Sequence, residues 1–246
     1  MLTYLDESYS NDKLMVGTLF ITSDSEKKFL HKGLRDIKIK ENFVDKNGNL
    51  KEIKYSKIKS KKTLRIAEES VNLFLNAYQS FFRVGIIKYS DKDLLNMRGT
   101  KDNNIKKAII YTQAVVLLVK NNYISKKITE GTLLMDNLTR CKGDLFNQII
   151  NKKLIKGTKL LKHVSYVDSS SAANHTIQIC DLLLGGIRNT LIPCKTNKFK
   201  NDFGKYIETT LKLPKLNYWK NKRQGAVEAK YPKCNIRFYG VPNCYK

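Results

Sequence analysis

Three apolar segments each hold an aspartate, and this pattern constrains the fold more than any other feature of the sequence. Residues 2–5 read as a short buried strand that ends at Asp6, and a second apolar run ends at Asp136. The stretch Ile177–Leu184 is apolar on both sides of Asp181. An ionised carboxylate in apolar surroundings is costly unless it is paired or bound to a cation. We therefore expect the fold to bring these three side chains together around shared metal.

Each aspartate also has a purely structural explanation. Asp6 and Asp136 follow predicted strands, where an aspartate commonly serves as a turn residue or a helix cap. Asp181 has no capping role in the middle of a helix, so its structural explanation is a salt bridge to Arg188 or to a lysine. The two explanations differ in whether the three carboxylates converge.

Hydrophobic periodicity predicts a mixed sheet with covering helices. A polar turn at Ser8–Lys13 joins the first two strands into a hairpin, in which Gly17 allows a close approach or a bulge. Asn47-Gly48 is typical of a hairpin turn that joins residues 43–44 to 50–55, and Asn103 or Asn104 can cap a helix. Strands at the start followed by alternating strands and helices indicate an α/β or α+β architecture. The other expected strands are 14–21, 81–89, 132–138 and 162–167, and the expected helices are 25–37, 63–80, 103–120, 144–155 and 174–191.

Residues 192–246 differ in amino-acid composition from the rest of the chain. They are rich in lysine and in interleaved aromatic residues such as Tyr218 and Trp219. We expect a core domain at residues 1–191 and a basic, aromatic-rich C-terminal extension at 192–246 that packs on the core.

The charge of the chain points to a polyanionic partner. Lysine and arginine number 46 against 22 aspartates and glutamates, which leaves a formal net charge of +24. This excess favours nucleic acid over an anionic membrane as the partner. The alternative is a lysine-rich compositional bias, although such a bias usually brings matching glutamate.

The composition also excludes several classes of site and location. The longest apolar stretches contain Asp, Asn or Lys, and Asp6 and Glu7 interrupt any apolar region near the start, so we expect no membrane span and no signal peptide. We expect a cytoplasmic protein. The five cysteines are scattered without metal-ligand spacing and read as reduced thiols, and three histidines are too dispersed for a histidine-based metal site.

Carboxylates gathered in this way suit the cleavage of phosphodiester bonds by two metal ions. The two ions lie roughly 3.5–4 Å apart, and one activates water while the other stabilises the leaving oxygen. Hard cations such as Mg²⁺ prefer oxygen ligands, and strand ends are a usual place for such a site.

Four short motifs resemble a known family. They are Tyr4-Leu5-Asp6-Glu7-Ser8, Glu52-Ile53-Lys54-Tyr55-Ser56, Leu134-Met135-Asp136 and Ile177–Gly185. In this order they resemble the family described as domain of unknown function 3800, over roughly residues 1–191. The resemblance implies a ribonuclease H-like fold, whose members are mostly metal-dependent nucleases, integrases and resolvases, and a role in antiviral defence against phage. Two departures are Tyr9, which stands where a glycine is usual, and the helical stretch at 25–37, which obscures the third strand of such a sheet.

The resemblance implies roles for individual residues. Asp6, Glu52, Asp136 and Asp181 would be the catalytic, metal-binding carboxylates for two ions of Mg²⁺ or Mn²⁺, with Asp6 bridging both. Taken alone, Glu52 reads as an exposed strand residue.

Other residues are assigned around these carboxylates. Glu7 is expected on the opposite face of the strand, supporting the ligands from behind. Lys54 would contact the scissile phosphate, and Gln178 would orient a ligand or touch the substrate. His175 is a helix-start residue or assists proton transfer. Lys57, Lys59, Lys61 and Lys62 would follow a nucleic-acid backbone, or form a solvated loop.

The sequence therefore predicts a metal-dependent nuclease, with RNA favoured over DNA by fold analogy alone. A non-catalytic nucleic-acid-binding subunit of a defence or mobile-element system is the first alternative. An enzyme that acts on a nucleotide or another small anion is the second. The oligomeric state stays open, a homodimer included.

Overall fold

The first two strands form the hairpin on which the sheet is built. The computed structural model describes residues 1–10, 12–97, 101–136, 145–170, 174–214, 225–228 and 233–239. Strand β1 (Leu2–Ser10) pairs antiparallel with β2 (Lys13–Ile21) along its full length. Nearly every residue of β2 is buried, as expected for a strand that is covered on both faces.

Within the described ranges, seven strands make one mixed sheet in the order β5-β4-β1-β2-β3-β7-β6. Strand β3 is antiparallel to β2, whereas β4 is parallel to β1 and β5 is parallel to β4. The sequence prediction of an α/β fold with a mixed sheet is thus confirmed. The remaining strands are β3 (Ser80–Lys88), β4 (Gly131–Asp136), β5 (Leu161–Val167), β6 (Gly225–Glu228) and β7 (Cys234–Tyr239).

Helices α1, α2, α3, α4 and α7 each begin at a side chain that accepts a hydrogen bond from a backbone N–H of the first turn, whereas α5 and α6 have no such side-chain cap. Ser60 and Thr63 form a capping box at α2, and Asp102 caps α4 by accepting from the Asn104 N–H, so neither predicted asparagine is the cap. The helices are α1 (Asp24–Lys40), α2 (Lys61–Asn76), α3 (Asp91–Asn96), α4 (Asn103–Ser125), α5 (Phe146–Ile150), α6 (His175–Leu191) and α7 (Lys198–Thr210), with a short 3₁₀ turn η1 (Tyr55–Lys57) and a π-helical turn η2 (Asn151–Lys156).

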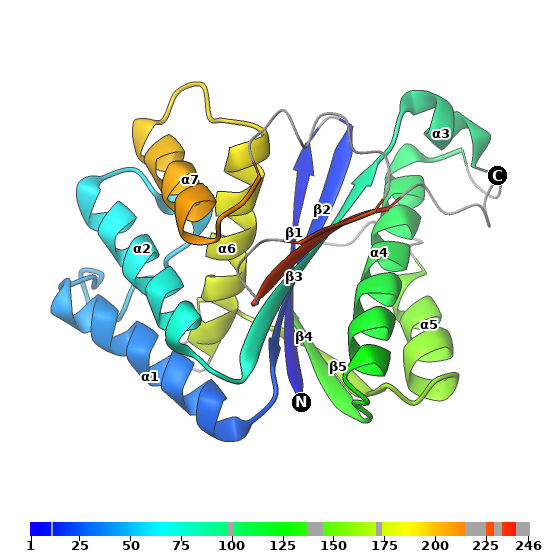
Figure 1. Ribbon diagram of the computed structural model, residues 1–246, viewed down its shortest axis with the longest axis horizontal. Helices are drawn as coiled ribbons and strands as arrows, with labels where there is room; N and C mark the ends of the chain where they lie inside the picture. The colour runs from blue at the N-terminus through cyan, green and yellow to red at the C-terminus, as the bar shows by residue number, and fades with distance from the viewer. Residues whose placement is uncertain are drawn as a thin grey trace.

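The helices cover the two faces of the sheet in separate groups. Helices α1, α2, α6 and α7 lie on one face, and α3, α4 and α5 lie on the other (Figure 1). Alternation along β1 feeds both layers, because Tyr4 packs in the core under α6 and Leu5 packs in the core under α4. The result is a three-layer arrangement with an apolar core on each side of the sheet.

Two predictions about the carboxylate segments are wrong. Strand β1 does not end at Asp6, because its pairing with β2 continues to Ser10 while its pairing with β4 stops at Leu5. Asp6 therefore lies in the middle of β1, at the level where β4 ends. The Asn47-Gly48 turn is present, with Gly48 at φ 80°, but Val44 and Leu50 form only an isolated bridge, and residues 51–54 are not a strand.

The described part of residues 192–246 enters the sheet and the core. Helix α7 packs on α6 through the buried Phe203 and Ile207, and β7 pairs parallel with β3. Tyr218 and Trp219 lie outside the described residues, as do the predicted end of one strand at 138 and the predicted helix start at 144.

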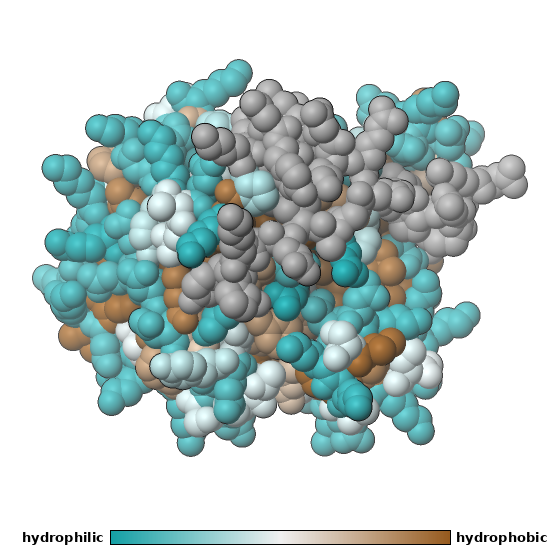
Figure 2. Space-filling view, viewed as in Figure 1, coloured by the Kyte–Doolittle hydropathy of each residue, from teal (hydrophilic) through white to brown (hydrophobic). Residues whose placement is uncertain are grey.

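Hydrophilic side chains cover most of the described surface in the view of Figure 2, and apolar side chains appear there in small groups. Within the described ranges, no helix combines the length and the apolar character needed to span a bilayer.

Candidate active site

A pocket of about 190 Å³ opens beside the carboxyl end of β4, and most of the predicted site residues line it. The parallel register pairs Leu5 with Met135, which places Asp6 and Asp136 next to each other on neighbouring strands. Helix α6 brings Asp181 against β1 from one side. The lining residues are Asp6, Glu7, Lys54, Asp136, Ser169, Ile177, Gln178 and Asp181.

Small residues allow α6 to approach the sheet at this level. The Sγ of Cys180 lies 3.7 Å from the carbonyl oxygen of Tyr4 and 3.6 Å from that of Gly17. A Cβ on Gly17 would come within 3.2 Å of Leu184 and 2.8 Å of Phe82. The prediction that Gly17 permits a close approach is confirmed, and this packing sets the depth of Asp181.

Asp6 and Asp181 form a carboxyl–carboxyl pair. Burial, then the charge of Asp181 and then that of Glu7 raise the pKa of Asp6 well above its ordinary value, and Asp6 shares a hydrogen bond with Asp181. Burial also raises the pKa of Asp181, against the hydrogen bond that its Oδ2 accepts from the backbone N–H of Tyr55 at 2.5 Å. The hydrogen bond between the two carboxyl groups raises the pKa of Asp6 and lowers that of Asp181, so Asp6 holds the shared proton, and the two neighbouring carboxylates oppose each other's ionisation.

The structural explanation for Asp181 does not hold. In the part of the chain that the structure describes, no ion pair joins Asp181 to Arg188 or to a lysine, and the buried Nε of Arg188 makes no hydrogen bond.

Glu52 and Asp136 are held by lysines. Lys54 Nζ lies 3.0 Å from Glu52 Oε1 and 3.2 Å from Asp136 Oδ2, and Lys57 Nζ lies 2.7 Å from Glu52 Oε2. The hydroxyl of Ser169 lies 2.5 Å from Glu52 and 3.0 Å from Asp136. Although burial alone would raise it, hydrogen bonds from Lys57, Ser169 and Lys54 lower the pKa of Glu52 to about 2. Glu52 is therefore a paired carboxylate of the site, not the exposed strand residue that it resembles in isolation.

Gln178 ties three segments together behind the pocket. Its Oε1 accepts hydrogen bonds from Lys38 Nζ at 2.6 Å and from the Ile53 N–H at 3.1 Å, and its Nε2 donates to the Ser169 carbonyl at 2.6 Å. Because Gln178 is buried, these bonds fix the segment that carries Glu52 relative to α6.

Lys38 and Ser169 belong to the site, but the sequence analysis did not predict them. Lys38 is fully buried on α1, and burial lowers its pKa to about 8. It follows Leu30 and Leu34 on the buried stripe of that helix, so a lysine in an apolar position was the available signal. Ser169 lies in the turn after β5, where nothing in the sequence marks it.

The remaining predicted residues surround the pocket. Glu7 follows Asp6 in β1, and alternation along the strand directs its side chain to the opposite face, as predicted. Glu7 nevertheless contributes to the lining of the pocket. His175 is the first residue of α6, as predicted, and its ring stacks on that of His31 with centroids 5.4 Å apart. Burial lowers the pKa of His175 to about 4. Lys59, Lys61 and Lys62 are exposed where α2 begins, and Lys57 is half-exposed.

The donor set fits a divalent cation in part. Among the described residues, no three Asp, Glu, His or Cys side chains are arranged so that they could hold a metal ion. Four carboxylates nevertheless line the pocket and supply the oxygen ligands that hard cations prefer, and a cation would relieve the repulsion that raises the pKa of Asp6. Lys54 stands between Glu52 and Asp136, where it neutralises both. A complete set of ligands thus requires a change in the position of Lys54.

Comparisons with known proteins add no relative. No model of a known protein family matches the chain, and no curated protein matches it.

Proposed function

We propose that this protein is a divalent-metal-dependent nuclease that hydrolyses phosphodiester bonds of nucleic acid, with RNA as the first substrate to test. The observation that carries the proposal is that Asp6, Asp136 and Asp181 line one pocket in a chain of net charge +24, with Glu52 joined to it through Lys54 and Ser169. Half-buried acidic side chains gathered in a strongly basic protein are best explained by a function that needs them.

The finer assignment of the fold belongs to the same proposal. Three consecutive antiparallel strands, β1 to β3, are extended on the other side of β1 by the parallel strands β4 and β5. This arrangement supports a ribonuclease H-like sheet whose third strand is delayed by α1 and α2. The resemblance to the family of unknown function 3800 and the role in phage defence are proposed with it, on the motifs of the sequence.

Asp6, Asp136 and Asp181 would hold Mg²⁺ or Mn²⁺, and the bound ions would activate water and stabilise the leaving oxygen. Asp6 must release its proton for this, which the repulsion from Asp181 opposes until positive charge is present. Lys54 would leave Asp136 and pair with the scissile phosphate, because both groups compete for the same ammonium. Glu52 keeps a second partner in Lys57 when Lys54 moves.

Substrate would reach the pocket over the exposed lysines at the start of α2. Lys59, Lys61 and Lys62 follow directly on the segment that carries Glu52 and Lys54. Phosphate contacts of this kind are released steeply as salt rises.

The test is cleavage of single- and double-stranded RNA and DNA with Mg²⁺, Mn²⁺ or chelator. Asp6→Asn and Asp181→Asn should lose cleavage while they keep nucleic-acid binding. Asp36→Asn, which changes an exposed aspartate on α1, is the matched control and should cleave like the unchanged protein.

Two outcomes contradict the proposal. Salt-sensitive binding without any metal-dependent cleavage would identify a non-catalytic nucleic-acid-binding subunit. Turnover of a nucleotide, with binding that depends only weakly on salt, would identify an enzyme that acts on a small anion.

A further inference from the structure

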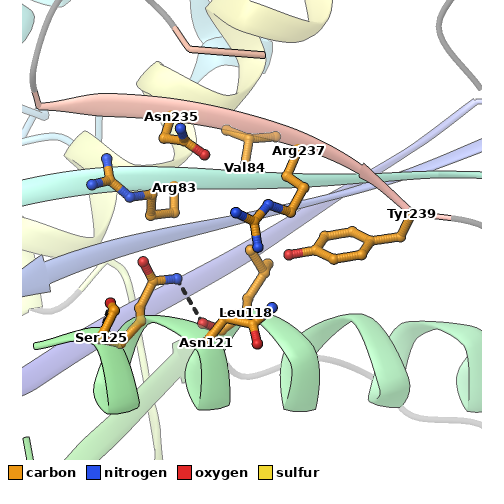
Figure 3. Close-up of a pocket in the computed structure, with 9 residues that line it drawn as sticks. Arg83, Val84, Leu118, Asn121, Ser125, Asn235, Arg237 and Tyr239 are labelled. Carbon is orange, nitrogen blue, oxygen red and sulfur yellow. Dashed lines mark hydrogen bonds between the residues drawn. The ribbon is translucent and has the colours of Figure 1, made fainter. Parts of the chain in front are cut away.

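A second pocket, also of about 190 Å³, lies between strands β3 and β7 and helix α4 (Figure 3). Helix α4 covers the face of the sheet opposite to α6, which carries Asp181 of the candidate active site. The two pockets share no lining residue. What this second pocket binds is therefore a separate question.

Two arginines line this pocket from neighbouring strands. The parallel register pairs Arg83 with Asn235 and Gly85 with Arg237, so Arg83 and Arg237 are diagonal neighbours on the same face of the sheet. The nine described lining residues include no acidic side chain. Two guanidinium groups in one small pocket make its lining positively charged, which favours an anionic occupant.

Helix α4 becomes polar at the same level. Leu118 lies on its buried stripe, but Asn122 and Ser125 continue that stripe one and two turns later, and Asn121 lies beside them. Asn121 and Ser125 are exposed, and Asn122 Nδ2 donates to the Leu118 carbonyl at 2.6 Å. The strands and the helix together therefore give the pocket a polar lining.

The arginines are placed for binding before any ligand arrives. The guanidinium of Arg83 lies 5.0 Å from the centre of the Phe81 ring, and its Nη1 donates to the Phe82 carbonyl at 3.2 Å. Arg237 extends from β7 toward α4, and the hydroxyl of Tyr239 points into the same space (Figure 3). No carboxylate among the described residues forms an ion pair with Arg237.

Gly85 keeps the floor of the pocket low. It lies directly beside Arg237 on the neighbouring strand. A Cβ at this position would come within 3.1 Å of Leu118 and 3.2 Å of Tyr239. A side chain here would therefore fill the space below the guanidinium of Arg237.

We propose that this pocket binds a phosphate group, with Arg237 as the principal contact and Arg83 beside it. The planar fork of a guanidinium matches two phosphate oxygens, and Asn121 and Tyr239 supply neutral donors. Phosphate is the chemistry that a nucleic-acid backbone and a free nucleotide share. The proposal does not depend on the hydrolysis proposed above, because none of these residues lines the first pocket.

The experiment reads the arginine side chains directly. Inorganic phosphate is titrated at constant ionic strength into the full chain labelled with ¹⁵N-arginine, and the Nε–Hε signals are followed by NMR. The Arg237→Lys variant identifies the Arg237 signal by its loss. We expect a saturable shift of the Arg237 signal and no shift of the signal of Arg35, which is exposed on α1.

A pair of matched variants measures the affinity. Arg237→Gln should weaken phosphate binding about tenfold or more, as expected for the loss of a charge-assisted contact. Arg35→Gln removes the same charge elsewhere and should leave binding unchanged. Because Arg237→Gln alters a strand, its unfolding curve is recorded alongside, and Arg237→Lys provides a variant that retains the charge.

Two further ligands identify the source of the phosphate. A mononucleotide that competes with inorganic phosphate indicates a nucleotide site, whereas a short oligonucleotide without terminal phosphates that shifts the Arg237 signal indicates a backbone contact. The proposal is overturned if none of the three ligands gives a saturable shift of Arg237, or if Arg237→Gln and Arg35→Gln bind alike. A negative result in this titration has no bearing on the cleavage assay, so the phosphate site and the nuclease activity can be refuted separately.

Discussion

Replacing Lys38 by methionine should stabilise this protein at neutral pH. Lys38 is fully buried, and burial lowers its pKa from the ordinary 10.5 to about 8. Methionine has a similar length and no charge. The partner atom, Gln178 Oε1, would keep its hydrogen bond from the Ile53 N–H.

The magnitude follows from the shifted pKa. A lysine whose pKa falls from 10.5 to about 8 on folding destabilises the folded protein by about 3 kcal/mol at pH 7. Removing the charge would therefore stabilise the fold, but loss of the hydrogen bond from Lys38 to Gln178 offsets about 1–2 kcal/mol of this stabilisation. We therefore expect the free energy of unfolding to rise by about 1–2 kcal/mol in Lys38→Met.

The sign of the pH dependence gives a second readout. Below pH 8 Lys38 is charged in both states and the full penalty is present. Between pH 8 and 10.5 the folded protein has released a proton that the unfolded chain still binds, so the stability of the unchanged protein rises with pH. The advantage of Lys38→Met should shrink over this range and vanish above it.

Urea unfolding at pH 7, 9 and 10.5 measures both effects. Lys106→Met is the matched control, because Lys106 is also buried in a helix and its Nζ donates to the Leu94 carbonyl at 2.5 Å. This control should lose about 1–2 kcal/mol, since it removes the hydrogen bond from Lys106 and leaves the Leu94 carbonyl with only its bond from the Met97 N–H. A Lys38→Met variant that is less stable at pH 7, or a difference that does not change with pH, would refute the argument from burial.

Three further predictions concern the pocket itself. Asp6→Asn should stabilise the metal-free protein by about 1 kcal/mol, and it should flatten the loss of stability that the unchanged protein shows as pH rises above the ordinary pKa of an aspartate. The reason is that the raised pKa of Asp6 lets the folded state keep a proton that the unfolded chain has released. Unfolding curves from pH 4 to 8 check this, and a destabilised variant contradicts it. Glu52→Gln should lower the free energy of unfolding by about 1–2 kcal/mol at pH 7. It should also remove the loss of stability that occurs as pH falls from 4.5 toward 2, since the lowered pKa of Glu52 stabilises the fold only above that range. An unchanged midpoint of acid unfolding would argue against the pairing of Glu52 with lysines. Gly185→Ala should lower the free energy of unfolding by about 1–3 kcal/mol, because the new Cβ would collide with the Tyr55 side chain and displace the Tyr55 N–H that bonds to Asp181. Calorimetry measures the change in unfolding temperature, and an unchanged temperature would show that Gly185 and Tyr55 are not tightly packed.

The elements of the core were largely predictable because their signals are local. The apolar stripe of α2, the buried run of β3 and the apolar stretch of α6 appear where periodicity placed them. The placement of Asp6 at a strand end failed for a nonlocal reason. The length of β1 is set by its partner β2, and nothing in residues 2–8 reports how far that partner extends.

The carboxylates of the site were also visible as misplaced charges, but their partners were not. An aspartate inside the apolar sequence of α6 is conspicuous by itself, whereas the lysines that neutralise Glu52 and Asp136 belong to a lysine-rich run in which no single residue stands out. Which lysine pairs with which acid depends on the path of residues 51–57, a segment without regular secondary structure up to Tyr55.

The positive charge, the order of most strands and helices, and the unusual positions of Asp6, Asp136 and Asp181 could all be predicted from the sequence. These properties depend on composition and on neighbours along the chain. Only the tertiary structure decided that Gln178 holds Lys38 beside the site and that Arg83 and Arg237 line one pocket, because each contact joins segments more than a hundred residues apart. Such contacts depend on strand order and register, which are properties of the assembled sheet.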